Sequence, residues 1–253
     1  MNLDVRQQGF VAIVTINRPP YNFLDMALVE QLADALEELD CQQTCRAVVL
    51  AAEGKAFCAG GNFSADGGEA FATGRVKSVY EEAVRLFSTR KPIVAAVHGA
   101  AIGGGLGLAL TADFRVTCPE AKFAASFTRL GVNPGFALLV TLPELIGRNK
   151  AELMFYTGRT VRGLEALASG LANVVVPREH VRQTAIDMAH EMADCAPLAV
   201  ASTRHMMRAG LVERIRAAAS ETMREQGRLR STEDFREGVK ANAEHRKPVF
   251  RGS

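Results

Sequence analysis

Short apolar runs that alternate with helical patterns are the feature that most constrains this fold. Most of these runs are rich in Val, Ile or Ala and are too short for a helix, which is typical of buried strands. The expected strands are residues 10–16, 46–51, 93–97, 114–117, 122–125 and 173–176. Leucines recur every three or four places from Leu24 to Asp40 and predict an amphipathic helix, and another helix is expected at about 70–90. The alternation predicts an α/β protein with a mainly parallel sheet.

The C-terminal part of the sequence has a different pattern. Beyond Pro134 it is helical almost to the end, with 173–176 as the only clear strand. The expected helices are near 180–195, 197–208, 211–229 and 232–245. We therefore divide the chain into a core, residues 1–195, and a helical C-terminal region, residues 196–253. Because no linker rich in Pro, Ser or Gly separates them, we expect the region to pack on the core or on a neighbouring subunit rather than form an independent domain.

Composition excludes several classes of protein. Apolar residues make up 48% of the 253 residues and charged residues 23%, which excludes a disordered chain, a collagen and a small disulfide scaffold. The net charge of +2 does not favour a nucleic-acid partner. No apolar run has the roughly 18 residues that a membrane span needs, and the first residues lack the pattern of a signal peptide. We therefore expect neither a membrane nor a nucleic acid as a partner.

The five cysteines are scattered and form no C-x-x-C pair. An odd number of unpaired thiols is typical of a reduced protein, so we expect a cytoplasmic location. Cys41 and Cys45 lie four residues apart, but no His or carboxylate follows at ligand spacing, so we expect no metal site.

Two glycine clusters carry the strongest chemical signal. They are residues 54–62, GKAFCAGGN, and 99–105, GAAIGGG, and each follows a short buried strand. A helix that begins within 103–105 leaves its first N–H groups free, and glycine lets a ligand approach the backbone closely. One N–H from each loop can hold an oxygen that becomes negative during a reaction, which is an oxyanion hole.

Two other interpretations of these glycines are open at this point. Phosphate binding is one, but the second cluster is not G-x-G-x-x-G and no Gly-Lys-Ser/Thr follows it. Tight packing between strand and helix is the other, and the residues alone do not favour the oxyanion hole over it.

Taken in order along the chain, these segments resemble the crotonase superfamily, also called the enoyl-CoA hydratase/isomerase family. The matching stretches are 17–24, 46–50, 55–62, 91–99, 102–106, 112–113, 121–123, 237–238 and 246–250. The resemblance implies a crotonase-like spiral of β-β-α units with a C-terminal helical region that builds trimers, often paired into hexamers. It also implies an acyl-CoA thioester as the ligand, with no further cofactor because CoA is part of the substrate.

The resemblance implies specific site residues. The thioester oxygen is expected between the backbone N–H groups of Gly61 and Gly104, where an enolate would be stabilised. Lys55 matches a basic residue near the nucleotide end of CoA, and Arg18 lies in the adjoining loop. Where many relatives carry an aromatic residue and a lysine in the tail, this chain has Asn242 and His245. The residues expected to contact the substrate are Arg18, Lys55, Ala59, Phe127, Arg246 and Lys247.

The sequence departs from the family at the positions that move protons. The two glutamates used for water addition match Gly107 and Phe127 here, and an aspartate used by some relatives falls near Gly135. Neither glycine nor phenylalanine transfers a proton, so we expect weak hydration. Asp66 is the first candidate for a base, although a solvated turn is its plainer interpretation. Other candidates are Glu69, Asp25, Tyr156, Ser126, Thr128 and Arg129. His98, before the second glycine turn, is expected to be structural.

Three functions stay open on this basis. The first is an isomerase, or a hydratase-like lyase with a relocated base. The second is a thioester hydrolase or decarboxylase on the same scaffold. The third is a protein that binds acyl-CoA without catalysis. The family resemblance favours the first function. Because both glutamates are missing, non-catalytic binding is better supported for this chain than for the family on average.

Overall fold

A computed structural model describes residues 2–62 and 75–253 of the chain. Its main sheet has six strands in the order β1-β2-β3-β4-β6-β9. These strands are β1 (Leu3–Gln8), β2 (Val11–Ile16), β3 (Ala47–Ala52), β4 (Ile93–Val97), β6 (Phe114–Thr117) and β9 (Val174–Val175). β1 is antiparallel to β2, and all other neighbours in the sheet are parallel. The predicted α/β class and the mainly parallel sheet are confirmed.

A second sheet of three strands, in the order β5-β7-β8, lies beside the first. Its strands are β5 (Ala100–Ile102), β7 (Lys122–Ala124) and β8 (Thr160–Arg162). β5 follows β4 after a turn of only two residues, so one strand of each sheet comes from the same stretch of chain. This switch between sheets brings the loop that follows β5 to the site described below.

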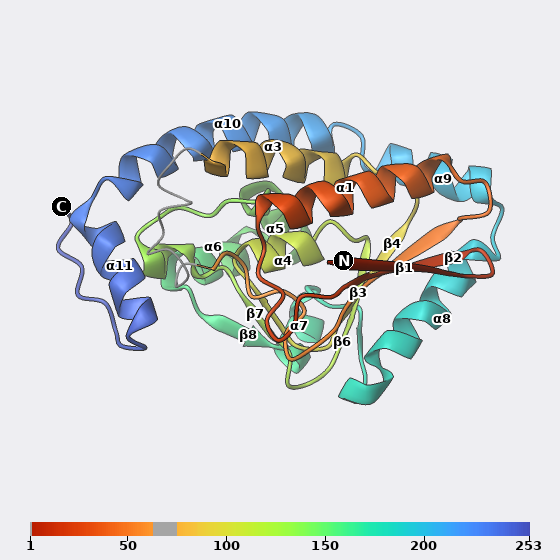
Figure 1. The fold of residues 1–253 in the computed structure, drawn as a ribbon, viewed down its shortest axis with the longest axis horizontal. Coiled ribbons are helices and arrows are strands. Elements are labelled where there is room, and N and C mark those ends of the chain that lie inside the picture. The colour runs from red at the N-terminus through yellow and green to blue at the C-terminus, as the bar shows by residue number, and fades with distance from the viewer. Residues whose placement is uncertain (1, 63–74) are drawn as a thin grey trace.

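Helices enclose the sheets. They are α1 (Met26–Cys41), α3 (Arg75–Phe87), α4 (Gly104–Ala109), α5 (Leu138–Ile146), α6 (Arg148–Thr157), α7 (Gly163–Ser169), α8 (Val181–Ala193), α9 (Pro197–Met207), α10 (Leu211–Arg230) and α11 (Glu233–Ala243), with short 3-10 turns η1 (Ser126–Leu130) and η2 (Arg178–His180). α3 packs between α1 and α10 on one side of the main sheet, while α8 packs on β3 and β4 from the other side (Figure 1).

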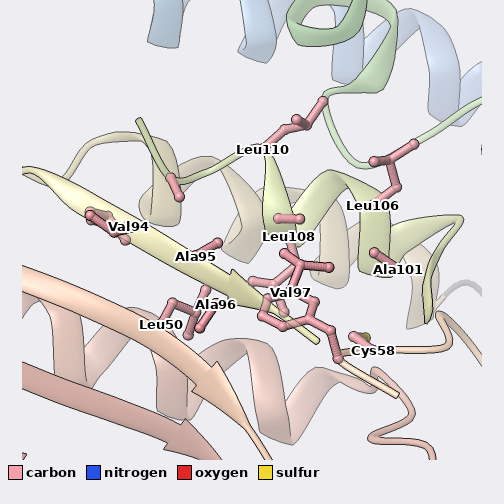
Figure 2. Packing of buried hydrophobic residues seen from close by; sticks show 14 of the residues in the cluster. Leu50, Cys58, Val94, Ala95, Ala96, Val97, Ala101, Leu106, Leu108 and Leu110 are labelled. Carbon is pink, nitrogen blue, oxygen red and sulfur yellow. The ribbon is translucent and has the colours of Figure 1, made fainter. Parts of the chain in front are cut away.

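The core lies where β4 and α4 meet. Strands β3 and β4 are buried along their whole length, as the continuous apolar runs predict for parallel strands covered on both faces. Figure 2 shows Val97 of β4, Ala101 of β5 and Leu106 and Leu108 of α4 in one cluster with Cys58. Each of these side chains is at most 1% exposed, so the glycine turns are supported by closely packed side chains.

Most expected elements are found within one or two residues, but β1 (Leu3–Gln8) was not among the expected strands, and two other differences stand out. The helix expected from Leu24 begins at Met26, because the Asp25 carboxylate accepts a hydrogen bond from Leu28 N (2.9 Å) and caps the helix. β5 and β8 have three residues each and were not expected, since so short a strand has no readable alternation. Of the helix expected at about 70–90, residues 70–74 lie outside the described residues.

The C-terminal helices pack on the body. Arg204 of α9 and Arg208, the residue after the end of α9, both bind the Asp113 carboxylate at 2.8 Å. Leu211 and Ile215 of α10 are buried against α3, and Phe235 and Val239 of α11 are buried against the segment around η1. These four side chains therefore pack against other elements of the same chain. None of the helices in the described ranges has the length and hydropathy of a membrane span.

Candidate active site

Two glycine turns meet at the ends of adjacent strands. Cys58 N donates to Ala100 O, and Ile102 N donates to Cys58 O, both at 3.0 Å, so the segment before Gly60 runs parallel to β5. A Cβ on Gly60 would lie 2.6 Å from Ile102 O, and one on Gly105 would lie 2.0 Å from Cys58 O. Since real side chains do not approach a backbone so closely, only glycine permits the two turns to come together.

The turns present two unused backbone donors to one cavity. Gly61 follows the first turn, and Gly104 is the first residue of α4, so its N–H has no acceptor inside the helix. Among the described residues, neither N–H donates to a protein acceptor. Both glycines line a cavity of about 1140 Å³ whose described walls also include Ala59, Phe127 and Phe136. The cavity is large enough to hold a sizeable organic ligand.

Aromatic rings lie against Gly107 and Gly135. A Cβ on Gly107 would lie 2.5 Å from Phe136 O and 2.7 Å from its ring. A Cβ on Gly135 would lie 2.0 Å from the phenol oxygen of Tyr80. Phe136 has a φ of 52°, uncommon outside glycine. Phe136 therefore leaves no room for a longer side chain at 107, and the Tyr80 ring occupies the space at 135.

Asp25 is the one carboxylate among the described residues that line the cavity. Its Oδ2 lies 2.7 Å from Arg18 Nη2, and its Oδ1 accepts from Leu28 N at 2.9 Å. Burial opposes the charged form, but these hydrogen bonds hold the pKa of Asp25 below its ordinary value. A carboxylate with that environment is a structural cap and ion-pair partner rather than a strong base.

Comparison with known proteins identifies the family. A family model described as enoyl-CoA hydratase/isomerase matches residues 6–253. A probable enoyl-CoA hydratase of Bacillus subtilis is 33% identical over 250 residues, which cover 96% of each chain. The chain belongs to the enoyl-CoA hydratase/isomerase family. A short-chain-enoyl-CoA hydratase of Clostridium acetobutylicum is 32% identical over 97% of this chain and 96% of its own.

Solved structures agree on the fold. The crystal structure of an enoyl-CoA hydratase/isomerase from Pseudoalteromonas atlantica T6c superimposes with a TM-score of 0.88 at 29% identity, over 99% of this chain and 100% of that one. The crotonase-like architecture predicted from the resemblance is thereby confirmed. The protein is therefore an enzyme of this family, also called the crotonase superfamily, and acts on acyl-CoA.

In this family member, the expected ligand contacts fall into two groups. Arg18, Ala59 and Phe127 line the cavity, together with the tail residues Asn242 and His245. The other expected contacts, Lys55, Arg246 and Lys247, are not among its described lining residues. Lys55 is exposed, with its backbone N–H bonded to Pro20 O at 2.9 Å, and Arg246 forms ion pairs with Glu237 (2.5 Å) and Glu244 (2.6 Å). Their assignment to CoA stays a prediction.

The candidate proton-transfer residues are also separated. Asp66 and Glu69 lie outside the described residues. Ser126 and Arg129 line the cavity, whereas Thr128 donates to Phe155 O (2.7 Å) and Tyr156 is 72% exposed on α6. His98 lies outside the large cavity, 3.1 Å from Gly54 O through Nε2, and burial lowers its pKa. In the part of the chain that the structure describes, no cluster of His, Cys, Asp or Glu side chains is arranged to hold a metal.

Two residues of the site were missed by sequence reasoning. Phe136 lies between Gly135 and Ala137. A large aromatic residue between two small ones is visible in the sequence, but it does not by itself indicate a site. Tyr80 comes from α3, 55 residues before Gly135, and nothing in the sequence links the two positions. Both residues fill the space beside the glycine positions, Phe136 at 107 and Tyr80 at 135.

Proposed function

We propose that this enzyme holds the carbonyl oxygen of an acyl-CoA thioester between Gly61 N–H and Gly104 N–H and works through the thioester enolate, as an isomerase or a hydratase-like lyase. The observation that carries the proposal is the convergence of these two unused donors on one cavity. The donors would face the oxygen where negative charge develops, which is the geometry that lowers the barrier to enolate formation. CoA is supplied with the substrate, so no further cofactor is proposed.

Isomerisation suits the cavity better than hydration. Water addition requires polar groups that orient a water molecule, and the rings of Phe127 and Phe136 provide none. Isomerisation only moves a proton between two carbons of the acyl chain, and one base suffices for that. Asp66, which follows the first glycine turn in sequence, remains the first candidate for this base.

The proposal predicts that the enzyme converts 3-hexenoyl-CoA into the conjugated 2-hexenoyl-CoA, because deprotonation at the α-carbon gives an enolate that the two N–H groups stabilise. The ultraviolet absorbance of the conjugated thioester measures the rate. Asp66→Asn is expected to slow it by about 10²-fold or more if Asp66 is the base. Binding of the thioester without conversion or α-proton exchange into D₂O would contradict the proposal and leave acyl-CoA binding as the function.

Decarboxylation is the second candidate, and the scarcity of carboxylates favours it. Loss of CO₂ from a 2-carboxyacyl-CoA leaves the electron pair on the α-carbon, so the enolate forms without a base. Among the described lining residues only Asp25 is acidic, and it is already paired with Arg18. Release of CO₂ from malonyl-CoA with protonation to acetyl-CoA would support this candidate over the first. A thioester hydrolase would require a group that orients water and is less well supported.

We further propose that the protein forms a trimer or a dimer of trimers, with residues from about 211 onward at the contacts. Val249 in that range is 69% exposed, and on the neighbouring α9 Leu198, Met206 and Met207 are at least 73% exposed. Large exposed apolar side chains of this kind are typical of interaction surfaces. Light scattering at micromolar concentration is expected to give three or six times the mass of the chain, and a monomer mass would contradict the proposal.

A further inference from the structure

The phenol of Tyr80 occupies the place of a side chain at position 135. A Cβ built on Gly135 would lie 2.0 Å from Tyr80 Oη and 2.4 Å from Cζ, so the ring and the glycine backbone are in close contact. The next residue, Phe136, packs on Gly104, since a Cβ there would lie 3.7 Å from Phe136 Cδ2. Tyr80, Phe136 and Gly104 all line the large cavity. Tyr80 of α3 therefore contacts Gly135. The next residue, Phe136, contacts Gly104, which carries one of the proposed oxyanion donors.

The phenol belongs to a buried hydrogen-bond network. Tyr80 Oη donates to Gln226 Oε1 at 2.9 Å, and Gln226 Nε2 donates to Asn133 O at 2.7 Å. Arg230 Nη2 donates to the same Gln226 Oε1 at 2.6 Å. Gln226 is 1% exposed and Tyr80 is 8% exposed, so water screens little of this network. The Tyr80 hydroxyl and the Gln226 amide each have a partner within the protein, as burial of polar groups requires.

The network permits the phenol to turn its proton toward a ligand. If Tyr80 donates elsewhere, Gln226 Oε1 still accepts from Arg230, so no buried acceptor is left unpaired. Burial raises the pKa of Tyr80 to about 12, so the group stays protonated and is a donor at neutral pH. Hydroxyl rotation about the Cζ–O bond needs no movement of the ring.

We propose that Tyr80 is a specificity-determining residue that donates a hydrogen bond to an oxygen on the acyl group, so that the enzyme prefers oxygen-bearing acyl-CoA thioesters, such as 3-oxoacyl-CoA, over plain alkyl ones. This inference rests on the proposed function, because it needs the acyl group in the cavity beside Gly104. When an oxygen-bearing acyl group binds, the Tyr80 hydroxyl exchanges its bond to Gln226 Oε1 for one to the ligand oxygen, while Arg230 keeps Oε1 paired. An alkyl chain offers the hydroxyl no acceptor, whereas a carbonyl or hydroxyl oxygen does.

The test is the binding of butyryl-CoA and acetoacetyl-CoA, which have equal carbon chains and differ by one oxygen at the third carbon. Calorimetry at pH 7 is expected to show that Tyr80→Phe weakens acetoacetyl-CoA binding by about 3- to 10-fold, which is the usual net worth of one neutral hydrogen bond. Butyryl-CoA binding to the same variant is expected to be unchanged, because the ring and its packing remain.

Tyr156→Phe is the matched control, because it makes the same chemical change on an exposed ring of α6 and should alter neither affinity. Equal losses for both thioesters in Tyr80→Phe would assign Tyr80 a structural role and overturn the inference. Unchanged affinity for acetoacetyl-CoA in that variant would also overturn it while leaving the proposed function intact. If the wild-type protein bound neither thioester, the proposed function would fall first and the inference with it.

Discussion

Replacing Gly104 by proline is expected to lower turnover by about 10²–10³-fold, whereas replacing it by alanine should retain most of it. Proline lacks the N–H group that is proposed to hold the thioester oxygen, and alanine keeps it. The effect is large because the donor acts on charge that develops only during the reaction, in a site that excludes much of the water.

The position is suited to this comparison. Gly104 is the first residue of α4, where proline is tolerated by the helix. A Cβ there would lie 3.5 Å from Leu24 Cδ2 and 3.7 Å from Phe136 Cδ2, which is ordinary contact. Both variants are therefore expected to fold, and thermal melting checks that they do. The assay is the conversion of 3-hexenoyl-CoA, and equal rates for the two variants would rule out Gly104 N–H as a donor.

Hydration of crotonyl-CoA is expected to be at least about 10³-fold slower than in a relative that carries both glutamates. Hydration needs one carboxyl to activate water and another to deliver a proton to the α-carbon, and Gly107 and Phe127 supply neither. Two groups that act as a unit do not contribute additively, so the residual rate can exceed the product of two single losses. The loss of crotonyl-CoA absorbance measures the reaction, and rapid hydration by the wild-type protein would point to a base not identified here.

The structure changes how lost hydration can be restored. From sequence alone we would introduce Gly107→Glu together with Phe127→Glu. A Cβ at 107 would lie 2.5 Å from the backbone oxygen of Phe136, so this variant forces the backbone apart and is expected to destabilise the fold. Phe127→Glu alone places a carboxylate on the cavity wall without that clash. It is the better variant, and any gain in crotonyl-CoA hydration would confirm the register of Phe127.

The two glycine turns that meet in the structure could be predicted because their signal is local. Each glycine turn follows a short buried strand, and the ordered matches to the family fix Gly61 and Gly104 within it. The same local reasoning identified the missing glutamates. It could not tell what fills the place of the aspartate at Gly135, because Tyr80 approaches Gly135 only through the packing of α3, a contact between distant parts of the chain.

The tail shows the same limit in the fold. Its helices could be predicted from periodicity, and their bounds differ little from those observed. Periodicity shows that a helix has an apolar face but not which surface covers it. Leu211 and Ile215 pack with Val84 and Phe87 of the same chain, whereas the sequence left open whether the tail packs on the core or on a neighbouring subunit. β8, with one apolar residue among three, has no pattern that indicates a strand.

The central claim is that Gly61 N–H and Gly104 N–H together hold the thioester oxygen. A crystal structure of the protein with bound butyryl-CoA tests it most directly, because this thioester has a carbonyl but no double bond to react. The account predicts the carbonyl oxygen within about 2.7–3.1 Å of both nitrogens, with the acyl chain beside Phe127 and Phe136. A carbonyl oxygen bound elsewhere in the cavity, with both N–H groups facing water, would contradict it.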